Sequence, residues 1–194
     1  MKPRLKDIHH RYGIPTEVIV EIDSREKFPI KFPATIKIVN PERRAERIPI
    51  NVMTRKVKLP FGDYRLAEFP ECCVVERKGG QREVAKNVFN PKDMVRQAKS
   101  FRRLAGGCKY PYLLIEVSPS NFMRKTKYVP DTEALIHRFA MAMVRYGFHV
   151  MWVPWRGRRR GSGSYQLGTL MLHTMLACAL KTKFDVLPDV MEAK

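Results

Sequence analysis

The strongest constraint on the fold is the way strand-like and helix-like segments alternate along these 194 residues. Residues 18–22 read as a first strand that ends at Asp23, and residues 112–116 read as a buried strand. A wide apolar helical stripe opens near Asp131 and closes at Gly147, and strand-like residues 149–153 follow at once. This order predicts an α/β fold with a mainly parallel central sheet flanked by helices.

The remaining segments place one domain between two short extensions. Residues 34–39 and 48–53 are strand-like, and residues 82–104 have helical spacing with a break before Pro91. A last helix is expected over residues 165–180. We therefore predict a domain over residues 18–180, a basic N-terminal extension over residues 1–17, with His9 and His10 in a mobile basic tail, and a C-terminal tail over residues 181–194.

The charge balance favours a polyanionic partner. The chain has 37 Lys and Arg against 19 Asp and Glu, a formal net charge of +18 and a sequence pI near 10.1. Phosphate backbones reward such an excess through counterion release, although an acidic protein or a membrane surface would also attract it. The chain has no apolar run long enough to cross a bilayer and no signal peptide, so we expect no membrane association and a cytoplasmic or nuclear protein.

Two short motifs bring carboxylates and a lysine together. Asp63 follows a glycine, and the apolar residues 73–75 lead into Glu76, Arg77 and Lys78. Two strands meeting at a turn would join these motifs, and on a strand Glu76 and Lys78 share one face while Arg77 looks the other way. Carboxylates can hold Mg²⁺ and a lysine can neutralise charge on a phosphate, so the pattern is compatible with metal-dependent phosphodiester hydrolysis. The alternative for these residues alone is that Glu76 and Lys78 form a solvated ion pair at a strand end.

Three motifs, in this order, resemble the signature of the XPF-type structure-specific endonucleases, a branch of the restriction-endonuclease-like superfamily. That signature is Asp-x-Arg-Glu, Gly-Asp-Tyr and Glu-Arg-Lys. The corresponding residues of this chain are Asp23-Ser24-Arg25-Glu26, Gly62-Asp63-Tyr64 and Glu76-Arg77-Lys78. The likeness extends over residues 18–180, so nearly the whole chain takes part in it.

The resemblance implies a role for each matched residue. Asp23, Asp63 and Glu76 would bind Mg²⁺, for which Mn²⁺ would substitute, and Lys78 would be catalytic. Arg25, Glu26 and Arg77 match positions needed for activity. The family carries an acidic residue four positions after the lysine, where this chain has Arg82. Glu83 is next to it, but one helical residue turns a side chain by about 100°, so the number of acids in the site is left open.

Two basic tracts are candidates for DNA contact. One lies on the helix after the catalytic strand, and the other precedes a Gly/Ser run, where the alternative is a solvated loop beside two tryptophans. The first tract is Arg96, Lys99, Arg102 and Arg103, and the second is Arg156, Arg158, Arg159 and Arg160.

The leading hypothesis is a stand-alone Mg²⁺-dependent endonuclease without a helix-hairpin-helix module. It would cut branched DNA, such as flaps, forks or junctions, in repair, recombination or replication. The alternatives are a catalytically impaired DNA-binding or partner subunit and, third, an RNA-binding or packaging protein. The resemblance also implies a homodimer or heterodimer through the late helices. The stripe of Met141, Met143, Met171 and Met175 would then be core or, in part, interface.

Overall fold

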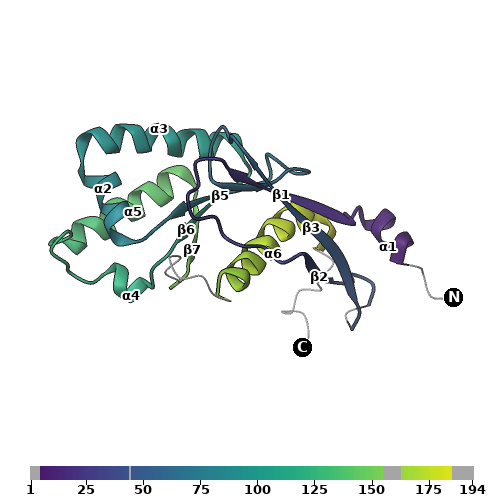
Figure 1. Ribbon diagram of the computed structural model, residues 1–194. Helices are drawn as coiled ribbons and strands as arrows, with labels where there is room; N and C mark the ends of the chain where they lie inside the picture. Colours follow the sequence, from purple (N-terminus) through teal and green to yellow (C-terminus); the bar gives the residue numbers. More distant parts are fainter. Residues whose placement is uncertain (1–4, 44, 155–162, 185–194) are drawn as a thin grey trace, which may run out of the picture.

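A single mixed sheet organises the molecule (Figure 1). The computed structural model describes residues 5–43, 45–154 and 163–184. Within these ranges seven strands form one sheet in the order β2-β3-β1-β4-β5-β6-β7. The strands are β1 (Glu17–Asp23), β2 (Thr35–Val39), β3 (Arg47–Val57), β4 (Tyr64–Leu66), β5 (Cys73–Lys78), β6 (Tyr110–Ile115) and β7 (His149–Trp152).

The strand directions divide the sheet into parallel and antiparallel pairs. β1 with β3, β5 with β6 and β6 with β7 are parallel, as the alternating pattern predicts. β2 with β3, β1 with β4 and β4 with β5 are antiparallel, so the sheet is mixed rather than mainly parallel. The reason lies in the connections, because the links between β2 and β3 and between β4 and β5 are too short for the crossover that a parallel strand needs. The α/β class itself is confirmed.

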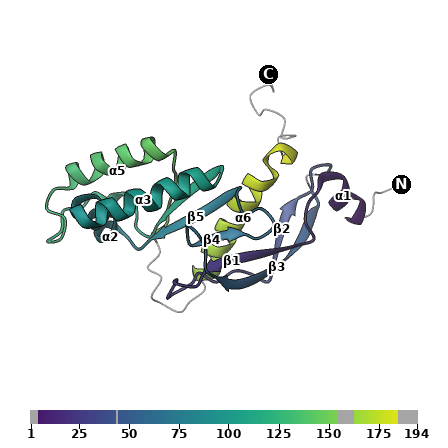
Figure 2. The same cartoon turned by 90° about the horizontal axis from the view of Figure 1, so that it is seen from above.

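Helices cover the sheet from opposite sides and create two apolar cores (Figures 1 and 2). One core packs α6 against the strands around β1, and it includes Met171 and Met175, which are fully buried. The other packs α2, α3 and α5 against β5, β6 and β7. The helices are α1 (Leu5–Tyr12), α2 (Gln81–Phe89), α3 (Pro91–Gly107), α4 (Pro119–Phe122), α5 (Thr132–Tyr146) and α6 (Gly163–Phe184).

Local signals in the sequence set the helix ends. The Asn90 side chain accepts hydrogen bonds from the backbone N–H groups of Lys92 and Asp93, so α3 starts directly after the break that Pro91 predicts. Asp131 caps α5 in the same way, and Gly147 ends it in the left-handed conformation. The predicted helix over the apolar stripe is therefore confirmed at both ends.

The N-terminal extension is more ordered than expected. Residues 5–12 form α1, and its Ile8 is buried in the core beside Ile14. His9 lies with Nδ1 3.0 Å from the carbonyl oxygen of Ile14, a contact that closes the end of the helix. The prediction that His9 belongs to a mobile tail is wrong, because the buried Ile8 anchors the helix to the core.

The four methionines of the expected stripe lie on α5 and α6. Met171 and Met175 of α6 belong to the core, whereas Met141 on α5 is 59% exposed, and its neighbour Val144 is 83% exposed. In the described part of the chain, no helix combines the length and apolar character needed to span a membrane. Met143 of α5 is partly buried against the second core, so Met141 is the exposed member of the stripe and the other three contribute to the cores.

Candidate active site

The ends of three strands bring the predicted acidic positions to one edge of the sheet. β1 and β4 pair with Ile22 opposite Tyr64, and the backbone N–H of Asp23 donates to the carbonyl oxygen of Asp63 at 2.8 Å. β4 and β5 pair with Tyr64 opposite Val75, and the N–H of Asp63 donates to the Val75 carbonyl at 2.9 Å. The turn predicted between Asp63 and Glu76 is therefore confirmed as the β4–β5 hairpin.

Gly62 has no tolerance for a side chain at the start of this hairpin. Its φ is +68°, and a Cβ atom there would lie 2.3 Å from Cγ1 of Val74. The glycine therefore lets the chain turn sharply enough to place Asp63 against β5.

We expect Gly62→Ala to lower the free energy of unfolding by about 2 to 4 kcal/mol, because left-handed strain adds to a core clash. Chemical denaturation measures the change. Gly106→Ala is the matched control, since a Cβ at Gly106 meets nothing within 4 Å. Equal stability of the two variants would contradict this account of the hairpin.

Asp63, Glu76 and Lys78 form the polar centre of the site. The Oδ2 atom of Asp63 accepts a hydrogen bond from the backbone N–H of Arg77 at 2.7 Å. The buried ammonium of Lys78 donates to Oε1 of Glu76 at 2.6 Å, so these two side chains share one face of β5 as predicted. These bonds leave Oδ1 of Asp63 and Oε2 of Glu76 available, and a cation could reach both carboxylates from there.

The electrostatics of the centre show that one lysine does not balance two carboxylates. Burial, with the nearby Glu76 carboxylate, raises the pKa of Asp63 to about 7. Burial disfavours the charged form of Lys78, but the surrounding carboxylates of Glu76, Glu83 and Asp63 outweigh it and raise the pKa of the ammonium. Lys78 therefore stays charged at neutral pH, while Asp63 is only partly ionised there, and a further positive charge nearby would favour its ionised form.

We expect this shift to appear in the stability of the metal-free protein. The pKa of Asp63 is raised from 3.8 in the unfolded chain to about 7 in the folded one, so its contribution is fully present below about pH 4 and is lost as the pH rises through about 7. Asp63→Asn should gain about 2 to 4 kcal/mol over the wild type across this window. Urea unfolding in a chelator across this range measures the difference, and parallel pH profiles would contradict the assignment.

Asp23 is already fully occupied by protein donors. Oδ1 accepts from the backbone N–H and Nε of Arg25, and Oδ2 accepts from Nη2 of Arg25 and the N–H of Leu59. The hydrogen bonds from Arg25 lower the pKa of Asp23 despite its complete burial. Arg25 would have to leave before Asp23 could bind a metal, so in this arrangement the pair fixes the end of β1.

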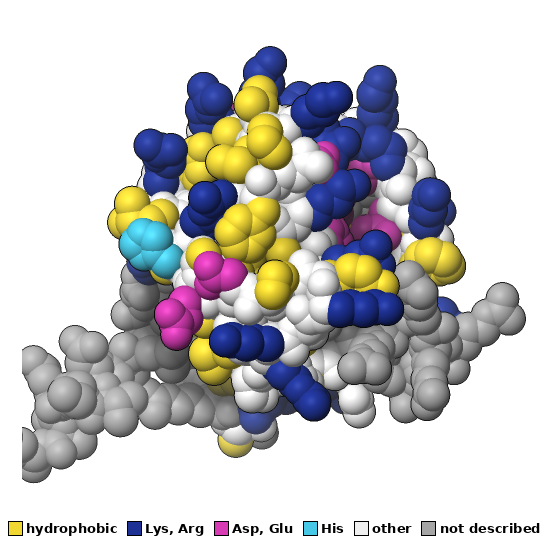
Figure 3. Space-filling model, turned by 90° about the vertical axis from the view of Figure 1, so that its left-hand side faces the viewer, with side chains coloured by type: hydrophobic (Ala, Val, Ile, Leu, Met, Phe, Trp, Pro, Cys, Tyr) yellow, Lys and Arg dark blue, Asp and Glu magenta, His cyan; other side chains and the backbone are white. Residues whose placement is uncertain are grey.

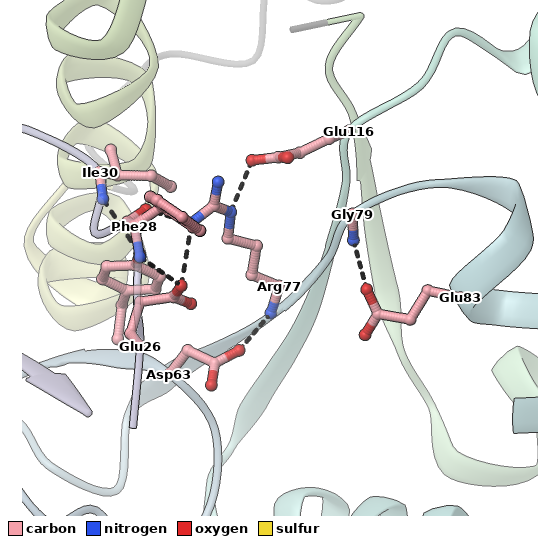
Figure 4. Close-up of polar contacts among 9 residues, drawn as sticks. Glu26, Phe28, Ile30, Asp63, Arg77, Gly79, Glu83 and Glu116 are labelled. Atoms are coloured by element: carbon pink, nitrogen blue, oxygen red, sulfur yellow. Dashed lines mark hydrogen bonds and ion pairs between the residues drawn. The ribbon is translucent and has the colours of Figure 1, made fainter. Parts of the chain in front are cut away.

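Arg77 points away from the catalytic face and clamps the loop that follows β1 (Figure 4). Its Nε donates to Oε1 of Glu116 at 2.5 Å, and its Nη1 reaches Oε1 of Glu26 at 3.2 Å and the carbonyl oxygen of Phe28 at 2.6 Å. Tyr64 supports the same loop, since its buried hydroxyl accepts from the N–H of Ile30. Glu26 and Arg77, both predicted from the resemblance, therefore meet as an ion pair beside the site.

At the start of α2 the side chain of Glu83 lies beside Lys78, whereas that of Arg82 lies beside Tyr128. Oε2 of Glu83 accepts from the backbone N–H of Gly79 at 2.8 Å, and Oε1 lies 3.7 Å from Nζ of Lys78 (Figure 4). Arg82 instead places its guanidinium 4.1 Å from the centre of the Tyr128 ring. A carboxylate therefore lies beside Lys78, although the residue four positions after that lysine is Arg82.

The donor set fits a divalent cation held by two carboxylates. Mg²⁺ takes one or two carboxylates and keeps several waters, so Asp63 and Glu76 are a sufficient protein contribution. Among residues 5–43, 45–154 and 163–184, no three Asp, Glu, His or Cys side chains converge closely enough to form a metal cluster by themselves. The raised pKa of Asp63 is the observation that favours an added cation at this place. The role of Asp23 as a metal ligand stays a prediction.

One of the two predicted DNA-contacting tracts can be described. The side chains of Arg96, Lys99, Arg102 and Arg103 are exposed on α3, and Arg96 pairs with Asp93 at 2.7 Å. Arg156, Arg158, Arg159 and Arg160 lie outside the described residues.

Three residues that sequence reasoning did not assign to the site take part in its framework. Glu116 forms an ion pair with Arg77, and Glu83 lies beside Lys78. Gln81 donates hydrogen bonds to the carbonyl oxygens of Phe122 and Arg124 and so holds the loop between α4 and α5. For Glu116 a signal existed, because it directly follows β6, and β6 runs parallel to β5 with Ile115 opposite Lys78. Parallel neighbours end at the same edge, so an acid there was a candidate.

Comparison with known proteins establishes the fold. Two solved structures of XPF from Aeropyrum pernix are similar to this chain with a TM-score of 0.52. The first structure is 20% identical, and the match covers 87% of this chain and 68% of that chain. The second, a complex with DNA, is 22% identical, and the match covers 90% of this chain and 69% of that chain. No family model and no curated protein matches the sequence. The chain therefore shares the fold of these XPF structures.

Proposed function

We propose that this protein is a divalent-metal-dependent DNA endonuclease that hydrolyses phosphodiester bonds in branched DNA. The observation that carries the proposal is the placement of Asp63, Glu76 and the buried Lys78 at one edge of the sheet, where Lys78 donates to Glu76 and Asp63 is held against β5 by the backbone of Arg77. The XPF fold and the net charge of +18 support a nucleic-acid substrate. DNA is favoured because one of the similar structures is a complex with DNA.

Each residue of the centre has a role that its contacts permit. Asp63 and Glu76 would hold Mg²⁺ or Mn²⁺ through the oxygens that the hydrogen bonds leave available. When bound, such a cation supplies Lewis acidity toward the phosphate and a more acidic water. Lys78, held charged by Glu76 and Glu83, stabilises negative charge that develops on the phosphate. Arg25, Glu26 and Arg77 keep the loop after β1 in place around these groups.

The second candidate is a nuclease-like subunit that binds DNA or a partner without cutting. It is motivated by Arg82 at the position of an expected acid. The contact of Glu83 with Gly79 and Lys78 favours the active enzyme, because it restores a carboxylate there.

The proposed assembly is a homodimer or heterodimer through the late helices. Its support is apolar surface, since Met141 and Val144 of α5 and Leu170 of α6 are exposed. Sedimentation velocity checks this, because a monomer at all protein concentrations would remove the homodimer.

A cleavage assay with labelled flap, fork, four-way-junction, hairpin and linear DNA tests the activity and the preferred geometry together. We expect cuts in Mg²⁺ or Mn²⁺ and none in chelator, with branched substrates cut faster than linear duplex. Binding without cutting on every substrate would favour the second candidate. Preference for RNA without any metal effect would point instead to an RNA-binding protein.

A further inference from the structure

A basic surface that neither predicted tract includes lies at the end of the molecule formed by α2, α4 and the loop into α5. On this face Lys and Arg side chains far outnumber Asp and Glu, and several stand around a hollow that contains acidic side chains (Figure 3). The loop contributes Arg124, Lys125, Lys127 and Tyr128, all exposed, and residues 118–130 contain no acidic residue. We call Arg82, Lys127 and Tyr128 the Tyr128 platform.

The platform holds two cations on one aromatic ring. The Arg82 guanidinium lies 4.1 Å from the centre of the Tyr128 ring, and the Lys127 ammonium lies 5.1 Å from it. Within the described residues, no carboxylate is at ion-pair distance from either cation. The negative faces of the ring attract both cations and offset their mutual repulsion. Two positive charges are thus presented together, ready for an anionic ligand.

A buried glutamine at the start of α2 fixes this loop. Nε2 of Gln81 donates to the carbonyl oxygens of Phe122 at 2.8 Å and Arg124 at 2.7 Å, and Oε1 accepts from Oγ1 of Thr126. Buried Phe122 and Val129 hold the two ends of the loop in the core. The exposed cations between them therefore stand on a supported segment, which lowers the cost of ordering them on a ligand.

The platform borders the candidate active site. Gln81 is three residues after Lys78, and Arg82 is adjacent to Glu83, whose carboxylate contacts the Gly79 backbone and Lys78. A strand whose phosphate lies at Asp63 and Glu76 would extend past the start of α2. Arginine matches phosphate oxygens with a planar pair of donors, and lysine adds a compact charge.

We infer that the Tyr128 platform binds the phosphodiester backbone of DNA beside the scissile phosphate. The inference rests on the proposed function, which supplies DNA as the ligand and the neighbouring Asp63–Glu76 centre as the place of cleavage. Arg82 acts here as a DNA-binding residue, and Tyr128 is a positioning residue that holds Arg82 and Lys127 side by side. Arg82, which replaces the acidic residue expected at this position, therefore contributes to DNA binding.

Fluorescence anisotropy with a labelled flap duplex, in Ca²⁺ and over a series of salt concentrations, tests the inference. We expect Arg82→Ala/Lys127→Ala to weaken binding about tenfold and to make the log K against log salt slope shallower by about 1.8, because two phosphates are no longer neutralised. Arg82→Lys/Lys127→Arg keeps both charges and should restore the slope. Arg11→Ala/Lys37→Ala removes the same charge from α1 and β2, at the opposite end of the molecule, and should stay close to the wild type.

The outcomes separate the platform from the nuclease proposal. Equal binding by the two charge-removing variants, whether both unchanged or both weakened, would overturn the platform. Cleavage by the wild type in Mn²⁺ is scored in parallel. If the wild type cuts no DNA but the platform variant binds DNA more weakly, the platform is supported as a binding site and the endonuclease proposal is rejected. If the wild type cuts DNA and the platform variant binds normally, only the platform is rejected. Thermal melting of each variant confirms that these exposed substitutions leave the fold intact.

Discussion

Asp63→Asn should reduce DNA cleavage by about 10³-fold or more while leaving DNA binding within a few-fold of the wild type. The amide keeps an oxygen that can accept the Arg77 N–H, so the hairpin stays closed. It loses the negative charge that would hold the cation against Glu76, and with it the electrostatic stabilisation of the reaction. Single-turnover cleavage of a labelled flap in Mg²⁺, with anisotropy for binding, measures both effects.

Glu133→Gln is the matched control for this substitution. It also converts an acid to an amide, but at an exposed position in the first turn of α5, outside the β4–β5 hairpin that carries Asp63, Glu76 and Lys78. We expect its cleavage rate to be unchanged. If Asp63→Asn cut as fast as this control, Asp63 would not be part of the reaction.

Arg77→Ala should cause the largest loss of stability, about 3 to 5 kcal/mol, because it leaves buried carboxylates without their cation. Arg77 is 9% exposed at its side chain and Glu116 is 7% exposed, so water cannot replace the missing guanidinium. Burial raises the pKa of Glu116 even with the Arg77 guanidinium beside it. The loop held through Glu26 and Phe28 would also be released. Denaturant titration of the variant gives the change in unfolding free energy.

A double-mutant cycle separates this effect from simple loss of packing. Adding Glu116→Gln to Arg77→Ala should recover at least about 1 kcal/mol, because the stranded charge is then removed. Arg43→Ala breaks the exposed pair with Glu46 and should cost no more than about 1 kcal/mol. Additive effects of the two substitutions at Arg77 and Glu116 would show that their ion pair is not the source of the stability.

The parts of the fold with local signals were predictable from the sequence. The cap at Asp131, the left-handed Gly147 and Pro91 after Asn90 each act within one helical turn, so the helix ends follow from the residues present. The strand directions did not follow, because a parallel or antiparallel neighbour depends on connections whose path the sequence does not specify. Helix α1 was missed because it is only eight residues long, too short to show a clear periodic pattern in the sequence.

The candidate site shows the same division between local and long-range information. The period of a strand placed Glu76 and Lys78 on one face and Arg77 on the other, and their hydrogen bonds agree. The occupation of Asp23 by Arg25 and Leu59 was not visible, since Leu59 approaches from a distant loop. Whether Arg82 or Glu83 turned toward Lys78 depended on how the chain passes Gly79 and Gly80, which only the folded backbone decides.

The most direct test is anomalous diffraction from crystals grown with Mn²⁺. We predict a peak in contact with the carboxylates of Asp63 and Glu76, close to Lys78, and no peak there in crystals of Asp63→Asn. A Mn²⁺ ion bound elsewhere, with these two carboxylates turned apart, would contradict the proposed site.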